Sequence, residues 1–226
     1  MRAVGKRARG TIRRQSFDGR YFRDHALRDA KGTLTVKGEK SETCQYYQFC
    51  FGVVSQDTHP ELWDRMATGF GPGKTSDGLQ PSDMFFGQLL RLDLLGRYGR
   101  YEQELAEIRH YFGKMAKESG ALWEFADGHD SRCHGFGSFV SVLLLRDILG
   151  VKEINSSDKY VSVSSAAAPI DNATATVRTA DGPLTFRLSR SGERSLRDAS
   201  LPSGWTLRRL DVGKAAGVSP FSSKEN

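Results

Sequence analysis

Acidic and imidazole side chains next to aromatic rings recur along this sequence, a pattern typical of surfaces that bind sugars. The polar residues are Glu42, Asp83, Glu124 and His134, and the nearby rings are Tyr46, Tyr47, Trp123 and Phe136. A flat apolar ring covers the C–H side of a sugar, and a carboxylate accepts hydrogen bonds from its hydroxyl groups. Two carboxyl groups across a glycosidic bond are the usual means of hydrolysing it. The residue types therefore indicate a carbohydrate-type cleft.

Most of these polar residues also have a purely structural interpretation. Glu42 and Asp83 fall in the first turn of predicted helices, where an acidic side chain complements the helix dipole. His134 is equally explained as a histidine whose hydrogen bonds are satisfied at a helix start. Glu124 has no evident capping role, and the apolar ring of Trp123 beside it is the kind of neighbour that raises the pKa of a carboxyl group. A functional role is therefore favoured most for Glu124.

The elements that must position these residues are helices, up to about residue 150. The apolar spacing predicts helices over residues 1–15, 42–54, 60–70, 82–95, 101–117 and 134–149. The second, fourth and sixth are apolar nearly all round, which predicts burial on every side. The third and fifth have one apolar stripe and are expected on the outside. This alternation indicates a partial (α/α)6 toroid with about half the helices of a closed one, in which parallel inner helices alternate with outer helices that run back.

Such a topology would bring the candidate residues together. Inner helices that run in the same direction have their N-terminal ends at one rim, and the helix dipoles favour carboxylates there. Glu42, Asp83, Glu124 and His134 all fall at these ends. We expect them to line one hollow.

After Gly150 the pattern changes to the period-two alternation of strands. Strands are predicted over residues 160–164, 173–177, 184–188 and 205–210, with a hairpin turn at Asp181-Gly182-Pro183. The fold class is therefore mainly α with a C-terminal antiparallel β domain. The predicted boundaries are 1–150 for the helical domain, 151–212 for the β domain and 213–226 for a flexible tail.

Composition and charge exclude several other classes. The chain has 226 residues, of which 38% are hydrophobic, and this is globular composition. No apolar run approaches the roughly 20 residues that cross a bilayer, and no signal peptide follows the basic start, so a cytoplasmic location is the default. Residues 1–28 hold nine Lys or Arg and two acidic residues of a chain with a net charge of +6. That excess fits either an anionic partner such as nucleic acid or a solvated helix face, and the lack of any nucleic-acid-binding motif favours no nucleic acid.

Cysteine and histidine spacing predicts no metal and no cofactor. Cys44, Cys50 and Cys133 form no CxxC pair, so neither a zinc ribbon nor a disulfide framework is expected. Cys44 and Cys133 are interpreted as packed small residues. His129, Asp130 and His134 lack the spacing of an HExxH site.

Four segments together resemble a known family. Ser41-Glu42-Thr43-Cys44-Gln45-Tyr46-Tyr47, Pro81-Ser82-Asp83-Met84-Phe85, Gly120-Ala121-Leu122-Trp123-Glu124 and Ser131-Arg132-Cys133-His134-Gly135-Phe136-Gly137-Ser138 resemble, in order and spacing, the C-terminal half of bacterial α-L-rhamnosidase-like six-hairpin glycosidases. The resemblance spans roughly residues 11–212 and implies a small β-sandwich after the partial toroid.

The resemblance also implies an activity and its residues. Hydrolysis in that family is inverting and needs no metal for its chemistry. Glu124 would be the general base that activates water, His134 would contact the sugar and Trp123 would pack on it. Glu42, Asp83 and Tyr46 are expected to complete the substrate-binding site. The family usually has Cys-Asn where this chain has Arg132-Cys133, which puts one amide contact in doubt.

The general acid of that family lies in the other half of the barrel, for which this chain has no corresponding segment. We therefore expect a truncated hydrolase that carries the base without the acid, and whose partner is a missing N-terminal half or a second copy. Glu42 or Asp83 as a substitute acid is a weaker possibility. The alternative is a catalytically inactive carbohydrate-binding or vestigial half-domain. Exposed inner helix faces would make the isolated chain poorly stable, oligomeric or inactive.

Overall fold

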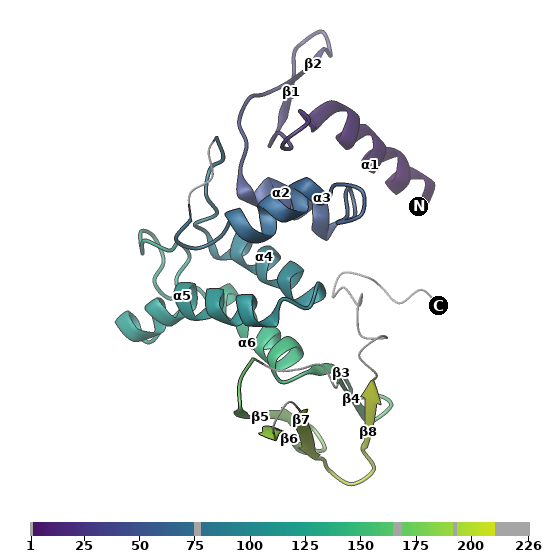
Figure 1. Ribbon diagram of the computed structural model, residues 1–226, viewed down its shortest axis with the longest axis vertical. Helices are drawn as coiled ribbons and strands as arrows, with labels where there is room; N and C mark the ends of the chain where they lie inside the picture. The colour runs from purple at the N-terminus through teal and green to yellow at the C-terminus, as the bar shows by residue number, and fades with distance from the viewer. Residues whose placement is uncertain (1, 75–77, 165–168, 192–193, 211–226) are drawn as a thin grey trace. The chain divides into compact units, whose positions relative to one another are not determined.

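The computed structural model describes residues 2–74, 78–164, 169–191 and 194–210, and the predicted tail at 213–226 lies outside these ranges (Figure 1). The described part of the chain combines helices with small sheets, which confirms the mixed fold class. It forms two compact units. Unit 1 contains Met1–Leu94 and His110–Gly137, and unit 2 contains Leu95–Arg109 and Ser138–Asn226. The domain boundary at residue 150 stays a prediction.

Unit 1 is mostly helical. Its elements are α1 (Arg2–Ser16), β1 (Ala26–Arg28), β2 (Leu34–Val36), α2 (Glu42–Cys50), α3 (Pro60–Asp64), the π-helical turn η1 (Arg65–Gly69), most of α4 (Phe85–Arg97) and the second half of α5 (Tyr101–Ser119). Figure 1 shows α2 beside α3. The apolar stripe of residues 60–70 packs on α2, and Phe49 meets Trp63 edge to face at 5.5 Å between ring centroids. The one-sided burial predicted for 60–70 is therefore confirmed.

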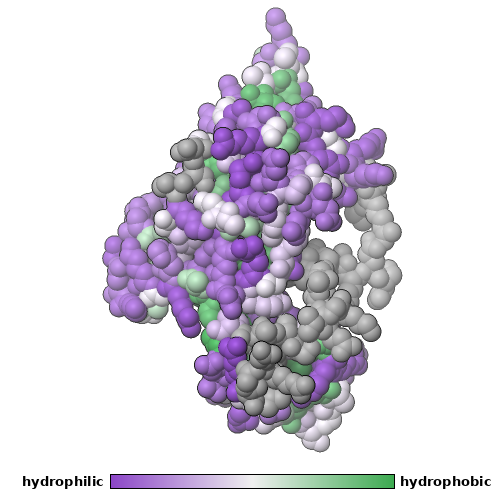
Figure 2. Space-filling view, in the orientation of Figure 1, coloured by the Kyte–Doolittle hydropathy of each residue, from purple (hydrophilic) through white to green (hydrophobic). Residues whose placement is uncertain are grey.

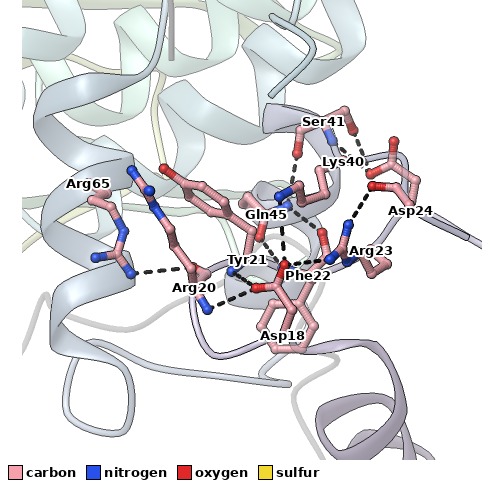
Figure 3. A network of polar contacts seen from close by, with 11 residues as sticks. Asp18, Arg20, Tyr21, Phe22, Arg23, Asp24, Lys40, Ser41, Gln45 and Arg65 are labelled. Carbon is pink, nitrogen blue, oxygen red and sulfur yellow. Dashed lines mark hydrogen bonds and ion pairs between the residues drawn. The ribbon is translucent and has the colours of Figure 1, made fainter. Parts of the chain in front are cut away.

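The segment after α1 is tied to the start of α2 by one buried amide (Figure 3). The Gln45 side chain accepts from the Phe22 backbone N–H at 2.8 Å and donates to the Phe22 carbonyl at 3.0 Å. The amide thereby satisfies both backbone polar groups of Phe22, as a neighbouring strand would. The side chain of Phe22 is fully buried. Ser41 caps α2 by accepting from the Cys44 N–H at 3.1 Å, which confirms the predicted N-cap.

Part of the basic excess in residues 1–28 has structural partners. Arg23 pairs with Asp18 at 2.9 Å and donates to the Gly38 carbonyl, as Figure 3 shows for the ion pair. Lys40 reaches the same Asp18 carboxylate at 3.6 Å. Backbone hydrogen bonds and these cations outweigh burial and hold the pKa of Asp18 below its usual range. Arg13 donates to the Val53 carbonyl. These contacts fit the interpretation in which basic side chains serve the fold.

Two predicted helices begin or continue differently in the structure. The helix predicted from residue 82 begins at Phe85, because residues 83–85 form backbone hydrogen bonds with the chain around Phe125 instead of entering a first turn. The helix predicted over 134–149 is split into a 3-10 segment η2 (Gly135–Phe139), α6 (Val140–Leu143) and a π segment η3 (Leu144–Ile148).

Of the three helices predicted to be buried on every side, only α4 comes near it, with Phe86 as its exposed apolar side chain. Helix α4 is covered almost all round, and even its Arg91 and Asp93 are buried. Helix α2 exposes Tyr47 and is followed by an exposed Phe51, so that prediction was wrong for this face. It was also wrong for the last helical stretch, where Val142 is half exposed.

Unit 2 is built mainly from two three-stranded sheets. Its elements are the first half of α5, α6, η3, β3 (Val151–Asn155), β4 (Tyr160–Ser164), β5 (Asn172–Thr179), β6 (Gly182–Ser191), β7 (Arg194–Ser200) and β8 (Thr206–Leu210). The sheet orders are β3-β4-β8 and β5-β6-β7. Val161 and Val163 of β4 share one hydrophobic cluster with Leu184 and Phe186 of β6. Side chains from both sheets therefore form a common core.

The antiparallel arrangement predicted for this part is correct for all pairs but one. Strands β4 and β8 run parallel, with Tyr160 opposite Thr206. A parallel pair needs a crossover of a dozen or more residues, and the chain between Ser164 and Thr206 supplies it by forming the second sheet. The sequence prediction gave one hairpin turn and an antiparallel domain, and so missed this pairing.

None of the helices in the described part of the chain has both the length and the apolar character needed to span a bilayer. On the face drawn in Figure 2, hydrophilic side chains predominate and hydrophobic ones form small separate areas.

Candidate functional site

The candidate residues of unit 1 are brought together by backbone pairing between the loop after α5 and the start of α4. The Phe85 N–H donates to the Glu124 carbonyl and the Ala126 N–H donates to the Asp83 carbonyl, both at 2.9 Å. The His134 N–H donates to the Leu122 carbonyl at 2.8 Å. These bonds fix Asp83, Glu124 and His134 along one short stretch of paired backbone, whereas the sequence prediction placed them at the starts of parallel helices.

Glu124 and His134 face each other within this stretch. Oε2 of Glu124 lies 3.6 Å from Nδ1 of His134, and both side chains are 24% exposed. The imidazole rests on the ring of Phe85 at 4.8 Å between centroids. A carboxylate and an imidazole that are partly open to solvent can hold hydroxyl groups, polarise a water molecule or transfer a proton.

An exposed aromatic ring stands next to this pair. Phe136 stacks on Phe85 with an interplanar angle of 9° and a centroid distance of 6.1 Å, and it is 74% exposed. His134 lies 5.6 Å from Phe136 between ring centroids. A carboxylate, an imidazole and an exposed flat ring therefore share one surface, which is the arrangement that a sugar ligand requires.

Trp123 supports the site from beneath. Its side chain is buried, and its Nε1–H donates to Ser119 Oγ at 2.7 Å. The guanidinium of Arg132 covers the ring at 4.7 Å from the centroid, and Arg132 Nε donates to the Gly128 carbonyl. Arg132, which departs from the family pattern, therefore closes the ring from above. In this conformation the Trp123 ring is covered by its neighbours in the chain, and its stacking on a sugar stays a prediction.

Glu42 and Tyr46 are also buried, and they bind each other. The Tyr46 hydroxyl donates to Glu42 Oε2 at 2.9 Å, and the Ser82 N–H donates to the same oxygen at 3.3 Å. Burial raises the pKa of the Glu42 carboxyl, while these hydrogen bonds and the nearby Arg91 oppose that shift. The pair links the start of α2 to the segment before α4. Both residues thus position the site, and a direct contact of either with substrate stays a prediction.

Asp83 is exposed and opens onto a cavity of about 210 Å³. The other polar side chains lining this cavity include His110, Tyr111 and Lys114. The Tyr111 hydroxyl donates to the Asp83 carbonyl at 2.7 Å, and burial raises the pKa of Tyr111, so its hydroxyl stays protonated. Glu124 and His134 are not among the lining residues. Asp83 is therefore joined to the Glu124 region by backbone pairing and faces a separate space.

The histidine near the loop tip has acidic neighbours of its own. His129 Nδ1 lies 2.5 Å from Asp127 Oδ1, and Nε2 lies 3.5 Å from Asp130 Oδ2. The hydrogen bond to Asp127 raises the pKa of His129. In the ranges that the structure describes, no cluster of three or more His, Cys, Asp or Glu side chains is arranged to hold a metal ion.

The cysteines divide into packed and exposed thiols. Burial raises the pKa of Cys44 to about 12, so its thiol stays protonated and behaves as the predicted packed residue. Cys133 is exposed, so the same interpretation was wrong for it. It lies between Arg132 and His134, in the loop before η2.

Unit 2 holds a buried polar cluster that sequence reasoning missed. Glu104 and Asp147 both lie against Gly96: a Cβ atom there would come within 2.7 Å of Asp147 Cγ and 3.1 Å of Glu104 Oε2. Arg146 and Lys152 both pair with Asp147. Burial, and next the charge of Asp147, raise the pKa of Glu104 to about 9. Glu104 is therefore a neutral acid at pH 7. The only signal in the sequence was an acidic residue on the apolar side of α5.

Comparisons with known proteins give one informative likeness. No family model matches the sequence, and no curated protein matches it. Among solved structures, the chain is similar to a GH78 family rhamnosidase of Bacillus sp. GL1, with a TM-score of 0.72 at 16% identity. The alignment covers 90% of this chain and 22% of that chain. The likeness shows the fold alone: this chain has a rhamnosidase-like fold and spans about a fifth of the length of that structure.

Proposed function

We propose that this chain is the base-bearing part of an inverting glycoside hydrolase of the α-L-rhamnosidase type, which acts on terminal α-L-rhamnosyl or similar bonds. The observation that carries the proposal is the Glu124–His134 pair beside the exposed ring of Phe136. The rhamnosidase-like fold supports the class of substrate. In the same proposal, the helices are part of an α/α toroid and the two sheets of unit 2 form a β-sandwich.

In the proposed reaction Glu124 is the general base. Its carboxylate takes a proton from a water molecule, and the water oxygen attacks the anomeric carbon from the face opposite the leaving group. His134 hydrogen-bonds a sugar hydroxyl and holds the sugar against Phe136. The leaving oxygen needs a proton from a second carboxyl, usually about 6.5–9.5 Å from the base in inverting enzymes. Asp83 opens onto another cavity and Glu42 is buried, which argues against either as the acid.

The proton donor is therefore proposed to come from outside this sequence. A partner on the far side of the bound sugar would bring a carboxyl opposite Glu124. An N-terminal half of the toroid or a second copy of the chain would both meet this need. General acid catalysis is typically worth about 10²–10⁴ in rate, so the isolated chain should be slow.

Binding of carbohydrate without turnover is the second candidate function. It is favoured by the ring of Phe136, because an exposed ring beside an imidazole and a carboxylate can hold a sugar whether or not water is activated. The two functions use the same surface and differ only in the fate of the glycosidic bond.

Hydrolysis of an aryl α-L-rhamnoside by the full chain distinguishes the two. If Glu124 is the base, Glu124→Gln lowers kcat/KM by about 10²–10⁴. Glu61→Gln, at an exposed carboxylate in α3, is the matched control and leaves the rate unchanged. A rate that is equal in wild type and Glu124→Gln excludes the catalytic role. L-rhamnose binding without any hydrolysis supports the second candidate.

A further inference from the structure

Five aromatic rings contact one another in series across unit 1; four of them are exposed, and Phe85, beneath Phe136, is buried. Phe51 stacks on Tyr47 at 5.6 Å between centroids, and Tyr47 lies 5.8 Å from Phe86. Phe86 lies 6.4 Å from Phe85, on which Phe136 stacks. These five residues, named here the aromatic row, connect the C-terminal end of α2 to the Glu124–His134 pair through the first turn of α4.

The row differs from the other apolar surface of unit 1 in its chemistry. Among the described residues of this unit, the exposed large apolar side chains outside the row are aliphatic and lie in α1 and β1: Val4, Ile12 and Leu27. The exposed aromatic ones all belong to the row. None of its members carries a charge, and the Tyr47 hydroxyl adds one neutral polar group. Flat, uncharged rings in series suit a neutral ligand with repeated flat C–H faces.

We propose that the aromatic row binds a neutral oligosaccharide, with successive sugars stacked from Phe136 towards Phe51 and the terminal sugar at Glu124 and His134. The inference rests on the proposed function, because the row ends at the same carboxylate and imidazole. It extends the bound ligand from a single terminal sugar to an oligosaccharide. Along the row, the rings of Phe86 and Phe85 stand between His134 and the two outer rings, Phe51 and Tyr47. Their contribution should therefore appear only with ligands longer than one sugar.

The test compares a rhamnose-terminated tetrasaccharide with free L-rhamnose by calorimetric titration of the full chain. All variants carry Glu124→Gln, which prevents turnover during the measurement. Phe51→Ala is expected to lower the ratio of tetrasaccharide affinity to L-rhamnose affinity about tenfold, or about 1.4 kcal/mol. Phe51→Trp keeps a flat ring and should retain the ratio. Leu27→Ala removes an exposed aliphatic side chain away from the row and is the control that leaves the ratio unchanged.

Three results overturn the proposal. In the first, the ratio of tetrasaccharide affinity to L-rhamnose affinity is the same with Phe51→Ala as without it. In the second, the Glu124→Gln chain does not bind the tetrasaccharide. In the third, sedimentation velocity shows that the chain self-associates and that Phe51→Ala abolishes the association. The last result would make the row an interface between copies. If the tetrasaccharide binds but wild type hydrolyses no rhamnoside, the row stands and only the catalytic role of Glu124 falls.

Discussion

Nδ1 of His134 lies 3.6 Å from Oε2 of Glu124, and the imidazole ring rests on Phe85. The ring contact restricts the rotation of His134, so the imidazole keeps one direction relative to the carboxylate. Because the start of α4 and the Glu124 loop also share backbone hydrogen bonds, both members of the pair are positioned by the same paired segment.

His134→Ala should lower kcat/KM on an aryl α-L-rhamnoside about 10-fold to 100-fold. The variant loses the hydrogen bond that the imidazole is proposed to make with a sugar hydroxyl. Steady-state kinetics measure the change, and circular dichroism checks the fold. His25→Ala, at an exposed histidine of unit 1, is the control. Equal activity of the two variants would remove His134 from the site.

Trp123 and Phe136 should behave oppositely although both are aromatic residues of the candidate site. Trp123 is buried, so Trp123→Ala should cost about 3–5 kcal/mol in the free energy of unfolding. Phe136 is exposed, so Phe136→Ala should cost less than about 1 kcal/mol and weaken sugar binding instead. Urea denaturation of the two variants gives both values. A loss that is similar in size for both would contradict the packing described above.

Glu104 should make stability depend on pH. Its pKa is about 9 in the folded chain and near 4.5 when unfolded, so between these values the folded state holds a proton that the unfolded state releases. Its contribution is fully present below pH 4.5 and is lost as pH rises towards 9. Each unit of difference between the two pKa values changes the free energy of unfolding by about 1.4 kcal/mol, so even part of the shift can be measured.

Glu104→Gln tests this assignment because an amide stays neutral at every pH. The variant should unfold at nearly constant free energy between pH 6 and 9, where wild type loses stability. Glu107→Gln, one turn further along α5, is the control and should keep the wild-type slope. Parallel pH curves for wild type and Glu104→Gln would refute the neutral acid.

Gly96 should tolerate no side chain. A Cβ atom there would overlap the Asp147 carboxylate and press on Glu104, both of which are buried. Gly96→Ala should therefore destabilise the chain by about 1–3 kcal/mol, although alanine is the better helix former. The matched change is Gly113→Ala in α5, where a Cβ atom meets nothing within 4 Å and should be neutral or stabilising. Thermal melts compare the two variants.

The sequence predicted those features that depend on local pattern. The one-sided helices at 60–70 and 101–117, the cap at Ser41 and strand β4 follow from apolar spacing and capping chemistry, and the structure has them. Glu124 and His134 lie together as the predicted hollow requires, whereas Asp83, also predicted there, faces a separate cavity.

What the sequence could not predict depends on contacts between distant residues. The late start of α4 results from backbone pairing with the Glu124 loop, and the carboxyl pair of Glu104 and Asp147 joins residues 43 positions apart. The predicted exposure of Trp123, Glu42 and Tyr46 to a ligand ignored the partners that bury them, such as Arg132 over Trp123. No periodicity reveals such partners.

The parallel pairing of β4 with β8 has a consequence for how the chain is made. During synthesis β4 leaves the ribosome with β3 as its neighbour, but its other edge must wait for residues 206–210. The β5-β6-β7 hairpins are complete by then, since their contacts are local. A chain that ended before residue 206 would therefore carry a folded three-stranded meander beside an open edge of β4, free to pair with another chain.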